Sequence, residues 1–405
     1  MIGLLGLGVT TASWAEDDGI YADFATSLGE FTVQLDFERA PRTVASFVGL
    51  ATGASGWLDA QCNVWTNKPF YDGSLFHRVV KDGFGNGIAI QGGGRISVSG
   101  GVTNLLGPGY TMLENFTNGL AHSNGVISVA NSGPNTDGSQ FFITATNVPF
   151  WDGGYTVFGH VTAGMDVVEA IAAVPVLDER PVDDVTVHSI NIRRVNTVAE
   201  AFDISAQGVP IIETGGMRAY MSGTNLVLDY ERVPQSKTLF RISEDLQAWE
   251  SSDWGLGYYT SGATSILTRT FAHAELGAAT FFHAARIRYP VPVTSPETQR
   301  GHTFTFWWDS PDLVYQVSLT NQPLGGGSGW VQDGTNAPYP RVVYADIWQR
   351  EAYMARLSFI DDLGRQYTYH LGFNPGEATN RFTGTWWVVT NSAQRYSLSG
   401  LFTMP

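Results

Sequence analysis

Three short segments, widely separated and in a fixed order, constrain this chain more than any other feature. Residues 76–80 read FHRVV, residues 91–93 read QGG, and residues 130–142 read ANSGPNTDGSQFF. Any one of them would be weak, because short patterns occur by chance. All three segments occur here in order over about the length of one domain, which indicates that they belong to a single folded domain.

The residues around these segments predict many strands and two helices. Alternating apolar and polar residues on both sides of Leu28-Gly29 are typical of a hairpin. Pro41 can open a helix, and Val44, Phe47, Val48 and Ala51 then fall on one face of it. Further strands are expected at 75–80, 88–91, 125–130, 140–146, 156–161 and 185–195, with a second short helix around 165–172.

Taken together, the three segments resemble the cyclophilin family of peptidyl-prolyl cis-trans isomerases over roughly residues 20–195. The resemblance implies a mainly β fold, a closed antiparallel barrel with a helix over each open end. Such closure would remove exposed sheet edges.

The resemblance also implies a catalytic centre and a substrate. The family places its catalytic arginine two residues after the phenylalanine of the first segment, as Arg78 is here. Its guanidinium would donate a hydrogen bond to the proline nitrogen of a twisted X–Pro amide. A surface ion pair is the alternative role for an arginine in a strand. The expected substrates are proline-containing polypeptides, and no cofactor or metal is required.

Other residues match family positions that contact substrate. Gln91 and Asn131 correspond to groups that hydrogen-bond its backbone, and Phe142 to an aromatic wall of the proline pocket. A structural role is an equal alternative for Gln140. Because side chains alternate along a strand, Phe141 should face the core when Phe142 faces the pocket. The remaining expected substrate-binding residues are Ala89, Ala130, Phe150, Trp151 and Tyr155.

The segment between Arg78 and Gln91 departs from the family pattern. The step from arginine to glutamine is thirteen residues here and usually eight in the family. Either Phe84 or Ile88 could therefore fill the pocket position. Because an aromatic face suits a proline ring better, we expect Phe84 to fold back into the groove and Ile88 to begin the next strand.

Composition excludes several classes of protein. The formal net charge is −15, and acidic residues outnumber basic ones in both halves, which argues against nucleic-acid binding. Cys62 is the only cysteine, so neither an intrachain disulfide nor a thiolate zinc cluster can form.

The first fifteen residues are expected to direct export. The run Met1–Val9 is apolar, and Ser13 and Ala15 suit cleavage after Ala15, although no basic residue precedes the run. The run is much shorter than the ~20 residues of a membrane-spanning helix, so no membrane insertion is expected. These features predict a periplasmic or extracellular protein.

The second half, residues 206–405, is expected to be an all-β accessory region. Its Gly-rich turns separate β-type runs, which suits a β-sandwich or a β-barrel. Pro290, Pro292 and Pro296 break it into two possible blocks, 206–290 and 297–405. The isomerase-like domain should end near residue 197 and work alone on short peptides.

Two functions therefore remain. The first is an exported prolyl isomerase. The second is a non-catalytic module at the cell surface that binds or scaffolds proline-containing segments. The five extra residues between Arg78 and Gln91 are the feature that distinguishes the two functions. If these residues distort the pocket, the protein could bind proline-containing segments without catalysing their isomerisation.

Overall fold

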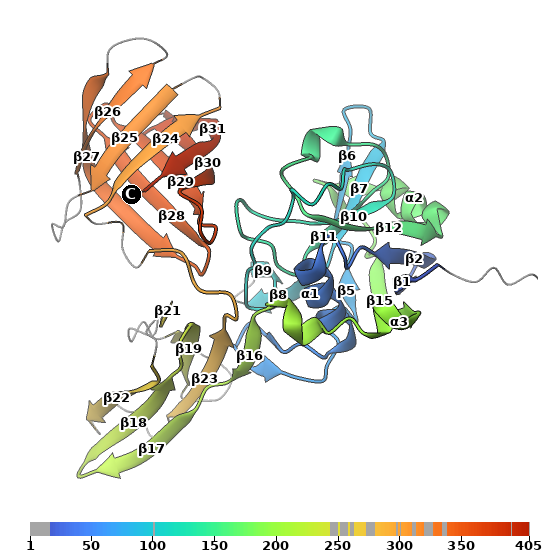
Figure 1. Ribbon diagram of the computed structural model, residues 1–405, viewed down its shortest axis with the longest axis horizontal. Helices are drawn as coiled ribbons and strands as arrows, with labels where there is room; N and C mark the ends of the chain where they lie inside the picture. Colours follow the sequence, from blue (N-terminus) through green and yellow to red (C-terminus); the bar gives the residue numbers. More distant parts are fainter. Residues whose placement is uncertain are drawn as a thin grey trace, which may run out of the picture.

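The computed structural model describes residues 17–99, 102–243, 250–251, 258–259, 263–272, 280–296, 299, 301–309, 313–319, 327–333, 338–389 and 391–404. They form a mainly β N-terminal unit, a middle pair of sheets and a C-terminal barrel (Figure 1).

The N-terminal unit is built on a nine-stranded antiparallel sheet in the order β5-β15-β1-β2-β12-β10-β11-β7-β6. Its strands are β1 (Gly19–Thr26), β2 (Gly29–Leu35), β5 (Ser74–Leu75), β6 (Arg78–Lys81), β7 (Gly87–Gly92), β10 (Val126–Val129), β11 (Phe141–Thr144), β12 (Val157–Ala163) and β15 (Thr186–Val195). A bridge between Leu75 and Gly94 joins the terminal strand β5 to the segment after β7. The sheet thus curls into the barrel-like form that the sequence predicts.

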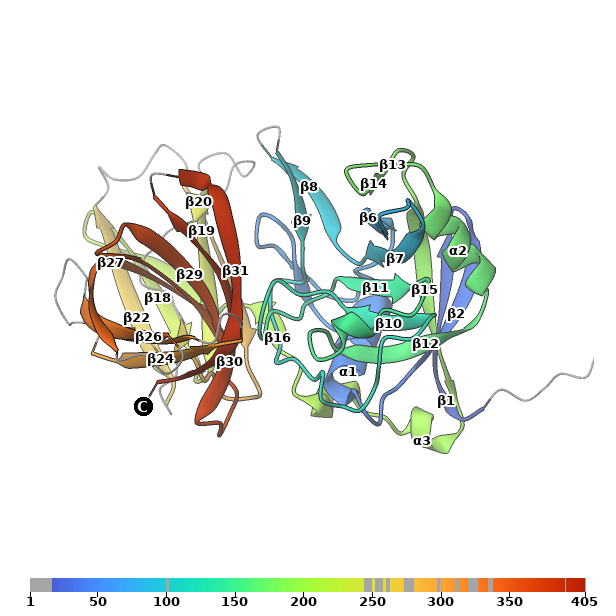
Figure 2. The ribbon, with the colours of Figure 1, turned by 90° about the horizontal axis from the view of Figure 1, so that it is seen from above.

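Two helices pack on this sheet where they were expected. Helix α1 (Pro41–Thr52) begins with Pro41 and ends before Gly53, whose φ of 75° is the left-handed conformation that glycine tolerates. Helix α2 (Met165–Ala173) contacts β2, β6 and β7. In both ribbon views strands of the sheet lie between α1 and α2 (Figures 1 and 2).

Aromatic side chains fill the barrel core. Phe24 stacks on Phe31 with centroids 4.5 Å apart, and Phe47 and Phe141 pack against Phe24 at 6.1 and 5.7 Å. Phe141 is therefore the core member of the Phe141-Phe142 pair, as alternation along β11 predicts.

Several short elements in this unit were not among those predicted from the sequence. The strand pairs are β3 (Trp57–Leu58) with β4 (Val64–Trp65), β8 (Arg95–Ser99) with β9 (Val102–Leu106), and β13 (Val176–Leu177) with β14 (Arg180–Pro181). The 3₁₀ turns are η1 (Pro149–Trp151) and η2 (Ile204–Gln207), and α3 (Thr197–Glu200) follows β15.

The second half is all β in its described residues. The middle part contains β16 (Ile211–Thr214), β17 (Met217–Ser222), β18 (Asn225–Arg232), β19 (Ser236–Ser243), β20 (Glu250–Ser251), β21 (Tyr258–Tyr259), β22 (Ser265–Ala272) and β23 (Phe281–Arg288). The closed barrel contains β24 (Thr303–Trp308), β25 (Leu313–Leu319), β26 (Gly327–Asp333), β27 (Tyr339–Arg350), β28 (Met354–Asp361), β29 (Arg365–Gly372), β30 (Thr379–Val388) and β31 (Asn391–Thr403). Each barrel strand pairs with the next, and β31 closes the ring on β24. Of the two architectures expected for residues 206–405, the closed barrel is observed for β24–β31, whereas β16–β23 form two separate sheets.

The three parts share one apolar cluster. It joins Leu58, Met112 and Leu113 of the first part to Ile287 of the middle part and Tyr353 of the barrel. None of the helices in the described ranges has the length and apolar character that crossing a membrane requires.

Candidate active site

The strand register brings the three predicted catalytic residues into one row. Arg78 on β6 lies directly opposite Gln91 on β7, and Gln91 lies directly opposite Phe142 on β11. Residues that face each other across neighbouring strands project their side chains to the same side of the sheet. Residues separated by up to 64 positions in the chain therefore meet on one face.

Hydrogen bonds connect the polar members of this row. Arg78 Nη1 donates to Gln91 Oε1 at 3.2 Å, and Gln91 Nε2 donates to Gln140 Oε1 at 3.0 Å. Gln140, for which a structural role was an equal alternative, is thus linked to Arg78 through Gln91. The Arg78 side chain keeps 45% of its surface exposed, so it remains open to a ligand.

Glu179 is a site residue that the sequence analysis missed. It accepts a hydrogen bond from Arg78 Nε at 2.7 Å, and its backbone carbonyl accepts one from Val79 N–H, also at 2.7 Å. Arg78 therefore does form the surface ion pair considered as an alternative, and it contacts Gln91 as well. Local pattern could not reveal this contact, because the two residues are 101 positions apart.

The turn that carries Glu179 has an unusual backbone. Asp178 and Glu179 connect β13 to β14 with φ of 49° and 63°. Two successive positive φ values define the hairpin turn that usually contains Asn or Gly. Non-glycine residues hold this conformation only when surrounding contacts impose it, and such residues cluster at functional sites.

Phe142 forms the centre of an aromatic cluster. Its ring meets Trp151 at 5.1 Å and Tyr155 at 5.3 Å, both edge to face. Phe150 touches Trp151 at 5.6 Å but is 72% exposed, so it lies at the rim. The structure therefore brings Phe142, Trp151 and Tyr155 together, and their contact with substrate stays a prediction.

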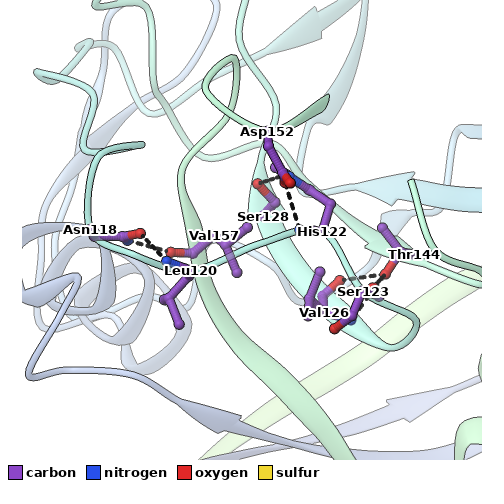
Figure 3. Close-up of polar contacts among 9 residues, drawn as sticks. All are labelled: Asn118, Leu120, His122, Ser123, Val126, Ser128, Thr144, Asp152 and Val157. Carbon is purple, nitrogen blue, oxygen red and sulfur yellow. Dashed lines mark hydrogen bonds and ion pairs between the residues drawn. The ribbon is translucent and has the colours of Figure 1, made fainter. Parts of the chain in front are cut away.

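A chain of three polar side chains lies beside Phe142, and Figure 3 shows its members, Asp152, His122 and Ser128. His122 Nδ1 lies 2.7 Å from Asp152 Oδ1, and His122 Nε2 lies 3.1 Å from Ser128 Oγ. The His122 ring stacks on Phe142 at 5.7 Å. Hydrogen bonds from the backbone and ring of His122 hold the pKa of Asp152 below its usual value.

Serine, histidine and aspartate in this order also occur in hydrolases, but here the arrangement is structural. The Ser128 side chain is fully buried, so no substrate carbonyl can reach its oxygen. Ser128 also lies opposite Phe142 in the sheet. The chain therefore ties the turn at Asp152 to β10 and to the ring of Phe142.

Asn131 is fixed on the loop that follows β10 and the predicted contact residue Ala130. Its Nδ2 donates to Gly154 O at 2.9 Å and lies 3.5 Å from Asp137 Oδ1. Burial raises the pKa of Asp137 to about 7, opposed by the hydrogen bond from Thr156 and reinforced by Glu114.

The expectation for Phe84 is wrong. Its ring is 95% exposed in the turn between β6 and β7, so it cannot line a pocket. Asp82 Oδ1 accepts hydrogen bonds from the backbone N–H groups of Phe84 and Asn86, at 2.9 and 2.8 Å, which closes the turn on itself. The extra residues extend the hairpin outward and do not fold back.

Ile88 and Ala89, the other predicted contact residues in this segment, are consecutive residues of β7. Ile88 is partly buried and Ala89 is fully buried. Ala89 lies two residues before Gln91, so alternation puts it on the same face as Gln91, and Ile88 falls on the other face. Ala89 is therefore the one of the two that shares a face with the row of Arg78, Gln91 and Phe142.

No cation site accompanies this groove. Within the described residues, no group of three or more His, Cys, Asp or Glu side chains is placed to hold a metal ion. Burial lowers the pKa of His77, beside Arg78, which suits a packed neutral ring.

Comparison with known proteins identifies the family of the N-terminal unit. The family model described as cyclophilin type peptidyl-prolyl cis-trans isomerase/CLD matches residues 21–192. Peptidyl-prolyl cis-trans isomerase B of Streptomyces anulatus is 37% identical over 176 residues, which cover 42% of this chain and 95% of that protein. Peptidyl-prolyl cis-trans isomerase A of Mycobacterium tuberculosis is 37% identical over 175 residues, 42% of this chain and 91% of that protein.

The chain belongs to the cyclophilin-type peptidyl-prolyl cis-trans isomerases. A crystal structure of a cyclophilin type isomerase from Cryptosporidium parvum aligns at 23% identity and a TM-score of 0.35, covering 44% of this chain and 99% of that one.

Proposed function

We propose that this protein is a prolyl isomerase whose clients are exported or extracellular polypeptides with X–Pro bonds. The observation that carries the catalytic part is the row of Arg78, Gln91 and Phe142 across three adjacent strands. The row combines a cation, an amide and an aromatic ring on one face, and a proline-containing backbone needs all three.

The physical task is to lower a rotational barrier. The peptide C–N bond has partial double-bond character, and its rotation barrier is ~18–20 kcal/mol. Uncatalysed X–Pro exchange takes tens to hundreds of seconds. A turnover of ~10²–10³ s⁻¹ would require the site to remove about 5.5–7 kcal/mol of that barrier. Only contacts that are stronger in the twisted state contribute to this gain.

Arg78 suits this task because of how it is held. In the twisted amide the proline nitrogen regains its lone pair and becomes a better hydrogen-bond acceptor. The Nε of Arg78 is occupied by Glu179 and one Nη by Gln91, which fixes the plane of the guanidinium. Its remaining N–H donors can then point at the reacting nitrogen without reorganisation.

The pocket and the neighbouring amides hold the substrate in place. Phe142 with Trp151 and Tyr155 offers aromatic faces to the proline ring. The Asn131 amide lies on the adjacent loop, where it can bond the flanking backbone. Holding both sides of the bond lets rotation proceed about a fixed axis.

The position of the extra residues favours catalysis over binding alone. A binding module would be favoured if these residues disturbed the row, but Phe84 and Asn86 lie in an exposed turn closed by Asp82. The pairing of Arg78 with Gln91 is intact beside them.

A protease-coupled assay on an Ala-Pro-Phe type peptide tests the activity, because the protease cleaves only the trans isomer. We expect cis-to-trans exchange to accelerate in proportion to enzyme concentration. Saturable peptide binding with no acceleration would instead support the binding module.

The apolar run Met1–Val9 and the small residues Ser13 and Ala15 support export. Expression of the full chain in a bacterial host, followed by fractionation and mass spectrometry of the N-terminus, tests it. We expect exported protein that begins at Glu16. Full-length protein found only in the cytoplasm would contradict the proposal.

A further inference from the structure

The loop that carries Asn131 leaves the sheet between β10 and β11. We call residues 131–137 the Asn131 loop. Ser132 N–H donates to Thr136 Oγ1 at 2.8 Å, and Thr136 Oγ1 donates to Gly133 O at 2.7 Å, so the loop is a compact turn. The position of this loop relative to Arg78 and Phe142 then depends on the residues outside the loop that it contacts.

Asn135 is the residue at which the C-terminal barrel contacts the turn. It is fully buried and has a φ of 56°, which asparagine tolerates better than most residues. Its backbone N–H and its Oδ1 both bond to Glu114. Its Nδ2 donates to Tyr353 O at 3.0 Å and to Asn374 Oδ1 at 3.1 Å.

The hydrogen-bond capacity of Asn135 is therefore divided between two domains. Both protons of the side-chain amide go to the barrel, to residues that flank β28 and β29. A buried donor left without its acceptor is unfavourable, so the contact resists separation.

Close packing surrounds this contact. A Cβ placed on Gly372 would lie 2.6 Å from Cβ of Pro134, and one placed on Gly133 would lie 3.0 Å from Thr383 Oγ1. Two glycines, one from each domain, thus allow the backbones to approach closely. In the view from above, β30 and β31 form the side of the barrel nearest the N-terminal unit (Figure 2).

A second contact from the barrel reaches the other loop that holds Asn131. Arg381 on β30 donates from Nη1 to Gly153 O at 2.7 Å, and its guanidinium lies 4.5 Å from the centre of the Phe116 ring. The next carbonyl, that of Gly154, accepts the hydrogen bond from Asn131 Nδ2. Arg381 therefore binds the carbonyl of the residue next to Gly154, whose own carbonyl orients the Asn131 amide.

We propose that the C-terminal barrel positions Asn131 for catalysis, with Asn374 and Arg381 as positioning residues. The barrel holds the Asn131 loop through Asn135 and the 152–155 turn through Arg381, and Asn131 bridges these two segments. The inference rests on the proposed isomerase function, and it gives residues 301–404 a role in that same site.

The expected effect follows from preorganisation. A loop fixed before substrate arrives loses less conformational freedom on binding and keeps its donor oriented in the twisted state. Removing contacts that act through another residue changes such coupling by about 2- to 30-fold. We therefore expect a moderate loss of activity with the chemistry of Arg78 intact.

The test uses full-length protein with substitutions in the barrel. The variants are Asn374→Ala, Arg381→Ala and the double variant, with Arg381→Lys as the conservative variant. Arg395→Ala is the matched control, because Arg395 is an exposed barrel arginine that also packs on an aromatic ring, that of Trp387 at 4.7 Å. The readouts are kcat and KM on an Ala-Pro-Phe type peptide, and amide hydrogen exchange in peptides spanning 130–138 and 152–156.

The double variant should lower kcat/KM about fivefold to twentyfold and speed exchange in both peptides, while exchange in β27–β29 stays as in wild type. Arg381→Lys should recover much of the loss, since lysine can still donate to Gly153 O, and Arg395→Ala should match wild type. Unchanged exchange in the Asn131 loop would overturn the proposal, and so would faster exchange with unchanged kcat/KM.

Amide hydrogen exchange does not depend on turnover. It therefore distinguishes failure of the proposed isomerase function from failure of the positioning role proposed for the barrel. If the wild-type protein proved inactive, the proposed function would fail, and the exchange readout would still decide whether the barrel holds the Asn131 loop. Should the double variant unfold its barrel, the two single variants provide the same comparison.

Discussion

Arg78 shows how one side chain can be held firmly and still remain available. Its Nε pairs with Glu179 and one Nη pairs with Gln91, yet almost half of the side chain is open to solvent. Fixed donors aimed at developing charge stabilise a transition state without reorganisation. The catalytic role proposed for Arg78 would therefore depend on the two residues that hold it as well as on its charge.

Replacing Arg78 with alanine should preserve the fold and remove most of the activity. Loss of one donor aimed at the transition state costs about 2.7–4 kcal/mol, or ~10²–10³ in kcat. Protease-coupled kinetics measure the fall, and circular dichroism checks the fold. Arg39→Ala is a suitable control, because Arg39 forms a surface ion pair with Asp36 at 2.6 Å, outside the row. Near wild-type turnover in Arg78→Ala would refute the assigned mechanism.

Glu179 should matter through Arg78. The pair is exposed, and exposed ion pairs contribute about 0.2–1 kcal/mol, so Glu179→Ala should lower kcat about two- to fivefold and leave KM nearly unchanged. Glu179→Gln keeps an acceptor oxygen and should retain most of the activity. Comparing the two variants at low and high salt measures the contribution of charge. Equal activity of Glu179→Ala and wild type would show that Gln91 alone orients Arg78.

Asp137 should make stability depend on pH near neutrality. Burial raises its pKa from 3.8 to about 7 in the folded state, so the folded protein holds a proton that the unfolded chain has lost between these values. The contribution of Asp137 to the free energy of unfolding is therefore fully present below about pH 4 and is lost as pH rises through 7. The loss is on the order of a few kcal/mol.

The variant Asp137→Asn removes that titration. Its Tm relative to wild type should rise between pH 5 and pH 8, as measured by scanning calorimetry in matched buffers. A Tm difference that is constant over this range would mean that Asp137 does not titrate there.

At the scale of elements, the hairpin β6–β7 shows what the sequence can and cannot predict. The three motifs located β6, β7 and β11 and the residues Arg78, Gln91 and Phe142, because strand alternation and motif order are encoded locally. The motifs did not predict the path of the five extra residues between Arg78 and Gln91. The outcome depends on Asp82, whose carboxylate closes the turn by capping Phe84 and Asn86.

The contact between Glu179 and Arg78 shows the same limit of local sequence patterns. Glu179 reaches Arg78 only because β14 contacts β6, a relation that no local pattern contains. Strands β8 and β9, which pair with each other, were likewise not predicted from the sequence.

The exposed turn gives a prediction at this scale. Phe84→Ala should leave kcat/KM within about twofold of wild type, because substitutions at exposed positions change free energies by roughly 0.5 kcal/mol or less. Phe142→Ala, in the pocket wall, should lower kcat/KM far more. If Phe84→Ala loses activity comparably, Phe84 must contact substrate after all.

For the whole molecule, the domain boundary matters more than the sequence indicated. Residues after 197 pack on the isomerase core: Phe202 meets Phe37 at 5.3 Å, and Ile204 packs on the same cluster. The barrel and middle sheets also cover Met112 and Leu113 of the first part. An isolated domain would expose this surface and free the Asn131 loop.

Three forms of the protein separate these effects: residues 17–197, residues 17–207 and the full chain. We expect Tm to rise in that order, because the second form restores Phe202 and Ile204, and a buried side chain of this size contributes about 1.5–3 kcal/mol.

The 17–207 form should fold and catalyse, since it contains Arg78, Gln91 and Phe142, but with a kcat/KM several-fold below that of the full chain. Differential scanning calorimetry and the protease-coupled assay measure the two quantities on the same samples. Full activity in the 17–207 form would show that the groove is complete within the first domain and that the barrel serves another purpose.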